Sequence, residues 1–305
     1  MKYFDIPSGP SGASRVALGC MRIGGMSPAE ADTYLHTVLE YGYNYFDHAD
    51  CYGNGGCEEV FGGALRRDPS LREKLIIQTK CAIHDGRYDF SKKHILSSVE
   101  GSLKRLGVDH IDVLLLHRPD ILMGPEEVAE AFDELAKSGK VGHFGVSNHS
   151  PAQIELLQRS VKQKLCINQM QLSITNATML SSGANVNLDN HDGVNRDGYL
   201  RDYCRLKGIT IQPWSPLQHG FIAGSFLGNE QFASLNQTIK EIAETYGVTD
   251  TGIAIAWLLR LPEKMQPVVG SVNLKRLKEI ADATEITLSA ADWYKIYRAA
   301  GYALP

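Results

Sequence analysis

The sequence lacks the features that mark several classes of protein. Its six cysteines form no Cys-x-x-Cys pair, so neither a zinc site nor a disulfide framework is indicated. No apolar run approaches the roughly 18 residues of a membrane-spanning helix, and the first residues lack the apolar stretch of a secretion signal. With 31 basic and 35 acidic side chains, the net charge of −4 lacks the positive excess of nucleic-acid binders. We therefore expect a cytoplasmic enzyme with no metal and no nucleic-acid or membrane partner.

An internal linker is also absent. No segment rich in proline, glycine and serine divides the 305 residues, so one domain covering residues 1–305 is predicted. This length suits a single α/β barrel. The hydrophobic fraction of 43% and the charged fraction of 22% are ordinary for a globular protein and argue against disorder.

What the sequence contains is a regular alternation of short apolar runs with longer helical patterns. The runs are Val16–Gly19, Tyr43–Phe46, Leu75–Thr79, Ile111–Leu116, Val141–Val146, Leu165–Asn168, Ile209–Gln212 and Val268–Val269. Strands that alternate with helices pair in parallel through right-handed crossovers. Eight such units favour an α/β fold of the (β/α)8 TIM-barrel type over an open doubly wound sheet.

Two long segments interrupt this alternation. Residues 173–198 follow the sixth strand and residues 217–236 follow the seventh. Long loops without secondary structure in a compact domain are usually functional. We expect both to line a substrate pocket, together with Cys20, Met21, Arg22 and Cys51.

Polar side chains stand where the predicted strands end, which is where barrel enzymes build their active sites. Asp47, Lys80 and His117 each follow an apolar run, and Tyr52 lies five residues beyond Asp47. Any one of them has an ordinary structural explanation, such as a helix cap or a solvated charge. Their convergence on one rim indicates an enzyme. The other groups at strand ends are Ser147, Asn148, Gln169, Trp214, Ser215, Gly270 and Ser271.

The four residue types suit proton donation to a carbonyl oxygen. A phenol with a pKa of about 10 is a weak acid, and a nearby ammonium is expected to lower that pKa. A carboxylate would hold the ammonium, and a neutral histidine would orient the substrate oxygen. This set can protonate the alkoxide that forms when a cofactor delivers hydride to a carbonyl. Trp214 offers a flat surface for nicotinamide, and Ser147, Asn148 and Gln169 carry groups that could orient its carboxamide.

A dinucleotide-binding glycine motif is missing from all strand ends, so a Rossmann site is not indicated. We expect the pyrophosphate of the cofactor to lie under the Gly220–Gly224 loop and near the helix that starts after Ser271.

Seven motifs in order along the chain resemble the aldo-keto reductases. They are FDHADCYG (46–53), LIIQTK (75–80), DVLLLHRPD (112–120), GVSN (145–148), NQMQ (168–171), PWSPL (213–217) and VVGSVNLKRLKE (268–279). The resemblance is greatest to bacterial NADPH-dependent oxidoreductases of that family. It implies a (β/α)8 barrel that reduces aldehydes and ketones with NAD(P)H.

The resemblance also implies roles for individual residues. Tyr52 matches the general acid, Lys80 and Asp47 its activating pair, and His117 the histidine that orients the substrate. The positions expected to bind the cofactor are Met21, Arg22, Ser147, Asn148, Gln169, Trp214, Ser215, Leu217, Gly220, Gly270, Ser271, Lys275 and Arg276. Arg276 matches the basic residue that contacts the 2′-phosphate, which favours NADPH over NADH.

The chain departs from the family pattern near that phosphate. Gly270 stands where some branches have a lysine, for which Lys275 could substitute, and Ile280 replaces an asparagine that reads adenine. Two other functions remain open: a Schiff-base aldolase with Lys80 as nucleophile, and a regulatory sensor that binds the nicotinamide nucleotide with little turnover. The sequence names neither the carbonyl substrate nor the oligomeric state.

Overall fold

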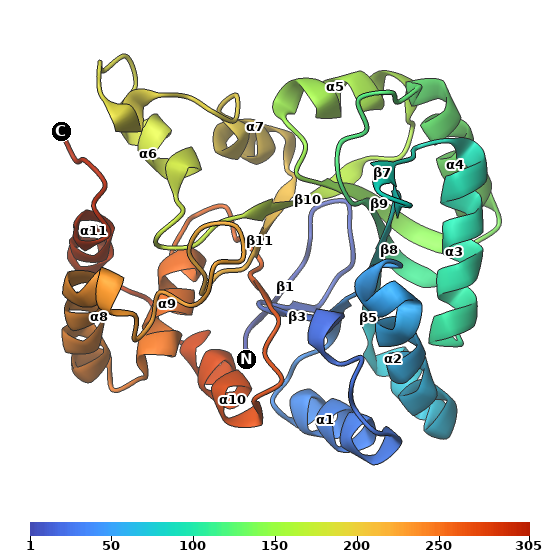
Figure 1. Ribbon diagram of the computed structural model, residues 1–305, viewed down its shortest axis with the longest axis horizontal. Helices are drawn as coiled ribbons and strands as arrows, with labels where there is room; N and C mark the ends of the chain where they lie inside the picture. The colour runs from blue at the N-terminus through green and yellow to red at the C-terminus, as the bar shows by residue number, and fades with distance from the viewer.

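Eight parallel strands close into a barrel in the computed structural model, which describes residues 1–305 (Figure 1). The strands are β3 (Ala17–Gly19), β4 (Tyr45–Asp47), β5 (Ile76–Cys81), β8 (Ile111–Leu116), β9 (Val141–Ser147), β10 (Leu165–Gln171), β11 (Thr210–Trp214) and β12 (Val268–Val269). Strands that follow one another in the chain are neighbours in the barrel, and β12 pairs with β3 to close it. The predicted (β/α)8 barrel is therefore confirmed, with one strand at each of the eight apolar runs.

Helices surround the barrel (Figure 1). They are α1 (Pro28–Glu40), α2 (Gly56–Arg67), α3 (Lys92–Leu106), α4 (Pro125–Lys137), α5 (Pro151–Ser160), α6 (Thr178–Ala184), α7 (Leu200–Lys207), α8 (Ala233–Tyr246), α9 (Asp250–Leu259), α10 (Leu274–Ala283) and α11 (Ala290–Ala299). Local sequence explains their ends. Ser91 caps α3 by accepting a hydrogen bond from the His94 N–H, and Gly107 ends that helix in the left-handed conformation (φ 68°). No helix is both long enough and apolar enough to cross a membrane.

The two long segments are more ordered than the sequence suggests. Residues 173–198 contain helix α6 and a 3-10 turn (His191–Gly193), and residues 217–236 contain a 3-10 turn (Glu230–Phe232) and the start of α8. Helix α6 forms because Met179 and Leu180 are buried in the largest apolar cluster. Only part of each segment is therefore loop.

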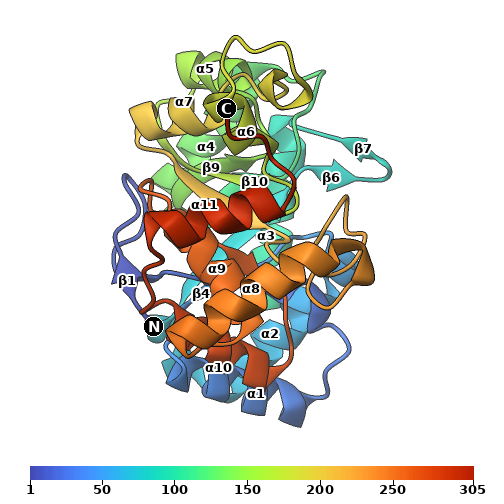
Figure 2. The same ribbon diagram turned by 90° about the vertical axis from the view of Figure 1, so that its left-hand side faces the viewer.

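Two antiparallel hairpins are added to the barrel. The first, β1 (Tyr3–Phe4) with β2 (Ala13–Ser14), packs Phe4 and Ile6 into one apolar cluster with the inward-facing barrel residues Val113 and Leu115. It thereby covers the end of the barrel opposite Asp47. The second, β6 (Ile83–His84) with β7 (Arg87–Tyr88), follows β5 and projects from the body of the molecule (Figure 2).

Helix α2 holds the segment that carries Tyr52. The 3-10 turn Tyr52–Gly55 leads directly into α2, and α2 packs closely on α3 through Gly62. A Cβ atom at Gly62 would lie 2.1 Å from the carbonyl oxygen of Arg105 and 2.6 Å from that of Leu106. Because both obstacles are backbone, neither can move aside cheaply.

We expect Gly62→Ala to lower the free energy of unfolding by about 1–3 kcal/mol, since it forces α2 and α3 apart. Gly63→Ala is the matched control, because the Cβ at that position would meet only the ends of the flexible Arg66 and Arg67 side chains. Alanine there should raise stability by up to about 1 kcal/mol through helix propensity. Urea unfolding of both variants checks this expectation, and equal stabilities would contradict it.

Candidate active site

A cavity of about 620 Å³ opens at the C-terminal ends of the barrel strands. It brings together fourteen of the residues expected from the sequence: Met21, Arg22, Asp47, Tyr52, His117, Ser147, Asn148, Gln169, Trp214, Ser215, Leu217, Gly270, Ser271 and Arg276. Five expected residues do not line it, and neither does any part of residues 173–198. Cys20 is buried, and Cys51 borders a second cavity instead. Lys80 is buried directly beneath, whereas Gly220 and Lys275 are exposed outside the lining.

A buried ion pair forms the base of this cavity. The Lys80 ammonium is 0% exposed, and its Nζ donates to Asp47 Oδ2 at 2.8 Å and to the His48 carbonyl oxygen at 2.7 Å. The third donation goes to the Tyr52 hydroxyl at 3.2 Å. Burial alone lowers the pKa of Lys80, but the charge of Asp47 and the hydrogen bonds to Asp47 and Tyr52 outweigh it and hold the pKa above its ordinary value. The lysine is therefore a fixed cation.

The sequence predicts that a nearby ammonium lowers the pKa of Tyr52, but the structure gives a raised pKa. Lys80 does lower it, but burial of the phenol raises it by more, so the pKa of Tyr52 stands above its ordinary value. The reason is that a phenolate loses more hydration in the cavity wall than one ammonium restores. Tyr52 consequently holds its proton at neutral pH.

His117 stands beside Tyr52 at the end of β8. The two rings meet edge to face, with centroids 5.8 Å apart. Burial, followed by the charges of Lys80 and Arg118, holds the pKa of His117 well below its ordinary value. The imidazole is therefore neutral and can donate one hydrogen bond, as the sequence predicts.

The side-chain amide of Asn148 bonds to two other residues that line the cavity. Asn148 Oδ1 accepts from Trp214 Nε1 at 3.1 Å, and Asn148 Nδ2 donates to Ser147 Oγ at 2.8 Å. Asn148 and Ser215 both have left-handed backbones, with φ of 61° and 52°. Such strain in non-glycine residues is typical of functional sites. Asn148 thus sets the orientation of the Trp214 ring that lines the cavity.

Gln169 turns its amide nitrogen into the barrel. Its Nε2 donates to Asp47 Oδ1 and to Gln212 Oε1, both at 3.0 Å, and its own oxygen has no hydrogen-bond partner in the protein. That oxygen is the free acceptor at the base of the cavity.

The start of α10 supplies the groups suited to a phosphate. Asn273 caps the helix by accepting from the Arg276 N–H at 3.0 Å. The Arg276 guanidinium lines the cavity without an ion pair or hydrogen bond of its own, whereas Lys278 is paired with Asp282. An unpaired cation at a helix N-terminus fits a phosphate group. The residues present therefore fit a nicotinamide dinucleotide.

Several lining residues are not singled out by the sequence: Gly19, Arg118, Pro216, Gln218, Ile222, Ser225, Leu227, Thr251, Val268, Val269, Val272 and Asn273. Beneath the cavity the sequence also leaves Gln78, Gln212 and Gln266 unassigned. Gln78 Nε2 donates to Asp47 Oδ1 at 2.5 Å and to Gln212 Oε1 at 2.9 Å. Side chains two residues apart on a strand point to the same face. This alternation could have identified Gln78 from Lys80, and Gln212 from Trp214, as residues that face the inside of the barrel.

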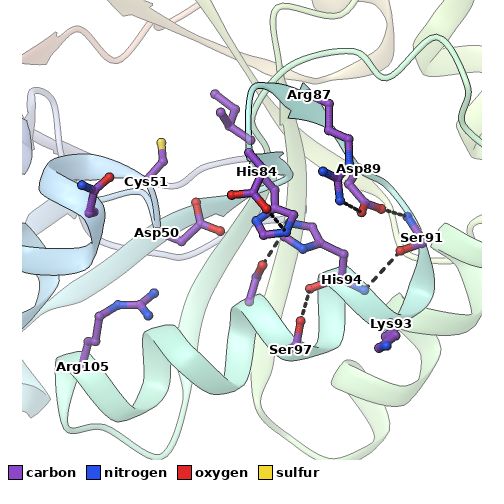
Figure 3. Close-up of a pocket in the computed structure, with 14 residues that line it drawn as sticks. Asp50, Cys51, His84, Arg87, Asp89, Ser91, Lys93, His94, Ser97 and Arg105 are labelled. Atoms are coloured by element: carbon purple, nitrogen blue, oxygen red, sulfur yellow. Dashed lines mark hydrogen bonds and ion pairs between the residues drawn. The ribbon is translucent and has the colours of Figure 1, made fainter.

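A second cavity, of about 580 Å³, borders the Asp50–Cys51 segment that precedes Tyr52 (Figure 3). In it the rings of His84 and His94 stack with centroids 4.8 Å apart. Burial raises the pKa of Asp50 to about 6. The wall of this cavity contains both acidic and basic side chains, namely Asp50, Asp85, Asp89, Arg87, Lys93 and Arg105. These charges compensate one another, so the cavity favours no one class of ligand.

Comparison with known proteins assigns the family. The model of the aldo/keto reductase family matches residues 15–300. The 6-dehydroglucose reductase of Agrobacterium fabrum is 36% identical over 297 residues, covering 93% of each chain. Oxidoreductase YdhF of Escherichia coli is 35% identical over 313 residues, covering 98% of this chain and 97% of its own. The solved structure of the thermostable aldo-keto reductase Tm1743 has a TM-score of 0.79 and 27% identity, covering 98% of this chain and 100% of its own. The chain thus belongs to the aldo-keto reductase family and is an NAD(P)H-dependent oxidoreductase.

Proposed function

We propose that the protein reduces a small aldehyde or ketone to an alcohol with NADPH, using Tyr52 as the general acid and residues 1–305 as one catalytic domain. One observation carries this proposal: Tyr52 lines the cavity, and its hydroxyl accepts a hydrogen bond from the fully buried Lys80 at 3.2 Å. A proton donor is thus held between the place for a substrate and a fixed positive charge.

The proton transfer follows from these contacts. Tyr52 keeps its proton until the substrate oxygen becomes an alkoxide, which is a stronger base than a phenolate. The phenolate left behind is stabilised by Lys80, whose ammonium Asp47 holds in place. A bound nicotinamide supplies the hydride for this reaction. Hydride and proton together convert the carbonyl into the alcohol, and neutral His117 can orient the reacting oxygen by donating a hydrogen bond.

The cofactor would be held at two ends of the cavity. The ring of Trp214 and the free oxygen of Gln169 suit the nicotinamide and its carboxamide, with Ser147 and Asn148 beside them. At the start of α10 the unpaired Arg276 suits a 2′-phosphate, which supports NADPH over NADH. Met21, Arg22, Ser215, Leu217, Gly270 and Ser271 line the cavity between or beside these ends.

The alternatives fit the site less well. A Schiff-base nucleophile must be a neutral amine, but the pKa of Lys80 is raised by Asp47 and Tyr52 even though burial lowers it. A sensor without turnover would have no use for a complete set of Asp47, Tyr52, Lys80 and His117 around one cavity. Neither alternative is favoured.

Tyr52→Phe should lower the rate of NADPH oxidation with an aldehyde by about a hundredfold or more, because the proton donor is lost. The affinity for NADPH should stay within about threefold, since the ring remains in place. Tyr294→Phe is the control, as that phenol lies on α11 and is 44% exposed. A fully active Tyr52→Phe enzyme would show that another group donates the proton.

Replacing Lys275 and Arg276 together with alanine should weaken NADPH far more than NADH, by about 1–3 kcal/mol for each charged hydrogen bond lost. Arg276→Ala alone should produce most of the loss, because only Arg276 lines the cavity. Lys278→Ala, which removes a lysine already paired with Asp282, is the charge-matched control. Fluorescence titration with both cofactors measures the effect, and equal losses for NADPH and NADH would refute the assignment.

A further inference from the structure

Arg118 lines the active-site cavity and has no part in the reaction described above. It follows His117 directly after the end of β8, and its side chain is half-buried in the wall that also contains Tyr52 and Trp214. A guanidinium is always charged, so this position places a permanent cation beside the proposed site of the carbonyl.

The guanidinium of Arg118 has no polar partner in the protein. None of its N–H groups donates a hydrogen bond, and no carboxylate lies within ion-pair distance. The acid nearest to it in sequence, Asp120, instead accepts from the backbone N–H groups of Phe90 and Leu122. Its contacts are aromatic: the guanidinium carbon lies 5.6 Å from the ring centroid of Trp214 and 5.9 Å from that of Phe221.

This arrangement positions the cation without using its donors. Cation–π attraction holds the guanidinium against the faces of the two rings, while the N–H groups lie at its edge. Its five N–H donors are unused by the protein and, because Arg118 lines the cavity, they are available to a ligand. The edge of a guanidinium matches the two oxygens of a carboxylate or a phosphate.

The other charges of the cavity leave Arg118 uncompensated. Only three other charged residues line it: Arg22, Asp47 and Arg276. Asp47 is neutralised by Lys80, and Arg22 donates to the Gly270 carbonyl oxygen at 2.8 Å on the side of α10. The wall next to His117 is therefore positive, and no protein group balances it.

We propose that the substrate is a carbonyl compound that also carries an oxyanion, a carboxylate or a phosphate, and that Arg118 binds this group. The proposal rests on the proposed function, because the carbonyl itself must lie at Tyr52 and His117. Arg118 is then a specificity-determining residue that selects anionic over neutral aldehydes of the same size.

Matched substrate pairs test the proposal. The carboxylate pair is 4-oxobutanoate and butanal, and the phosphate pair is glyceraldehyde 3-phosphate and glyceraldehyde. In the unaltered enzyme the anionic member of at least one pair should have a kcat/KM about tenfold or more above its neutral partner. Arg118→Met should lower that value by about 10- to 100-fold, mainly through KM, and change the neutral partner by less than about threefold. The pair that responds identifies the oxyanion.

Two further variants separate charge from packing. Arg118→Lys keeps the charge and should restore part of the preference, although an ammonium cannot bind an oxyanion through a planar fork. Arg159→Met makes the same change in net charge at an exposed position near the end of α5 and should change nothing. The affinity for NADPH should be equal in all variants. Equal losses for charged and neutral aldehydes in Arg118→Met would overturn the proposal.

The experiments distinguish a wrong role for Arg118 from a wrong proposed function, because the two errors give different results. If neutral aldehydes are reduced and the anionic ones are not preferred, only the role of Arg118 is wrong. If no aldehyde oxidises NADPH, the proposed function fails, and calorimetry with butanoate and inorganic phosphate on the NADP-loaded protein still tests Arg118. Weaker binding in Arg118→Met would then support the oxyanion site, and unchanged binding would overturn it.

Discussion

The ion pair between Lys80 and Asp47, buried at the base of the cavity, is the constraint on which the rest of the site depends. Two charges removed from water are tolerated only when hydrogen bonds satisfy their remaining donors and acceptors. Lys80 uses the His48 carbonyl and the Tyr52 hydroxyl, and Asp47 accepts from Gln78 and Gln169. The hydroxyl of Tyr52 is thus one of the three acceptors that the buried ammonium requires.

This requirement divides the barrel interior into two halves. Around Asp47 the inward-facing side chains are amides, whereas toward the opposite end most are apolar and pack with Phe4 and Ile6 of the first hairpin, with Gln266 as the exception. A second buried charge, Glu58 of α2, accepts from Thr79 Oγ1 at 2.6 Å and pairs with Arg105 of α3 at 2.8 Å. That bond ties the helix after Tyr52 to the strand that carries Lys80, so both partners of the 3.2 Å contact are anchored.

The barrel could be predicted from the sequence because alternating strands and helices are local patterns. The grouping of Asp47, Tyr52, Lys80 and His117 could be predicted as well, because the C-terminal ends of the strands meet at one end of a barrel. The rest depends on tertiary packing. The paths of the long segments decide that Gly220 lies outside the cavity wall while Ile222 lies within it. The net direction of the Tyr52 pKa depends on how far the phenol is removed from water, which spacing does not reveal. Arg118 could be seen in the sequence, but its lack of a partner could not, because Asp120 stands two residues away and bonds elsewhere.

The glutamine chain inside the barrel has a direction. Gln266 donates to the carbonyl oxygen of Ser14 at 2.7 Å, Gln212 donates to Gln266 at 2.8 Å, and Gln78 and Gln169 both donate to Gln212. Turning any one amide over would set oxygen against oxygen or N–H against N–H, so the amides can only reverse together. The chain ends on an acceptor at both sides, the Ser14 carbonyl of the first hairpin and the Asp47 carboxylate, so both ends require the same orientation of every amide. The floor of this barrel thereby takes part in ordering its active site, through the polarity of a single hydrogen-bonded chain.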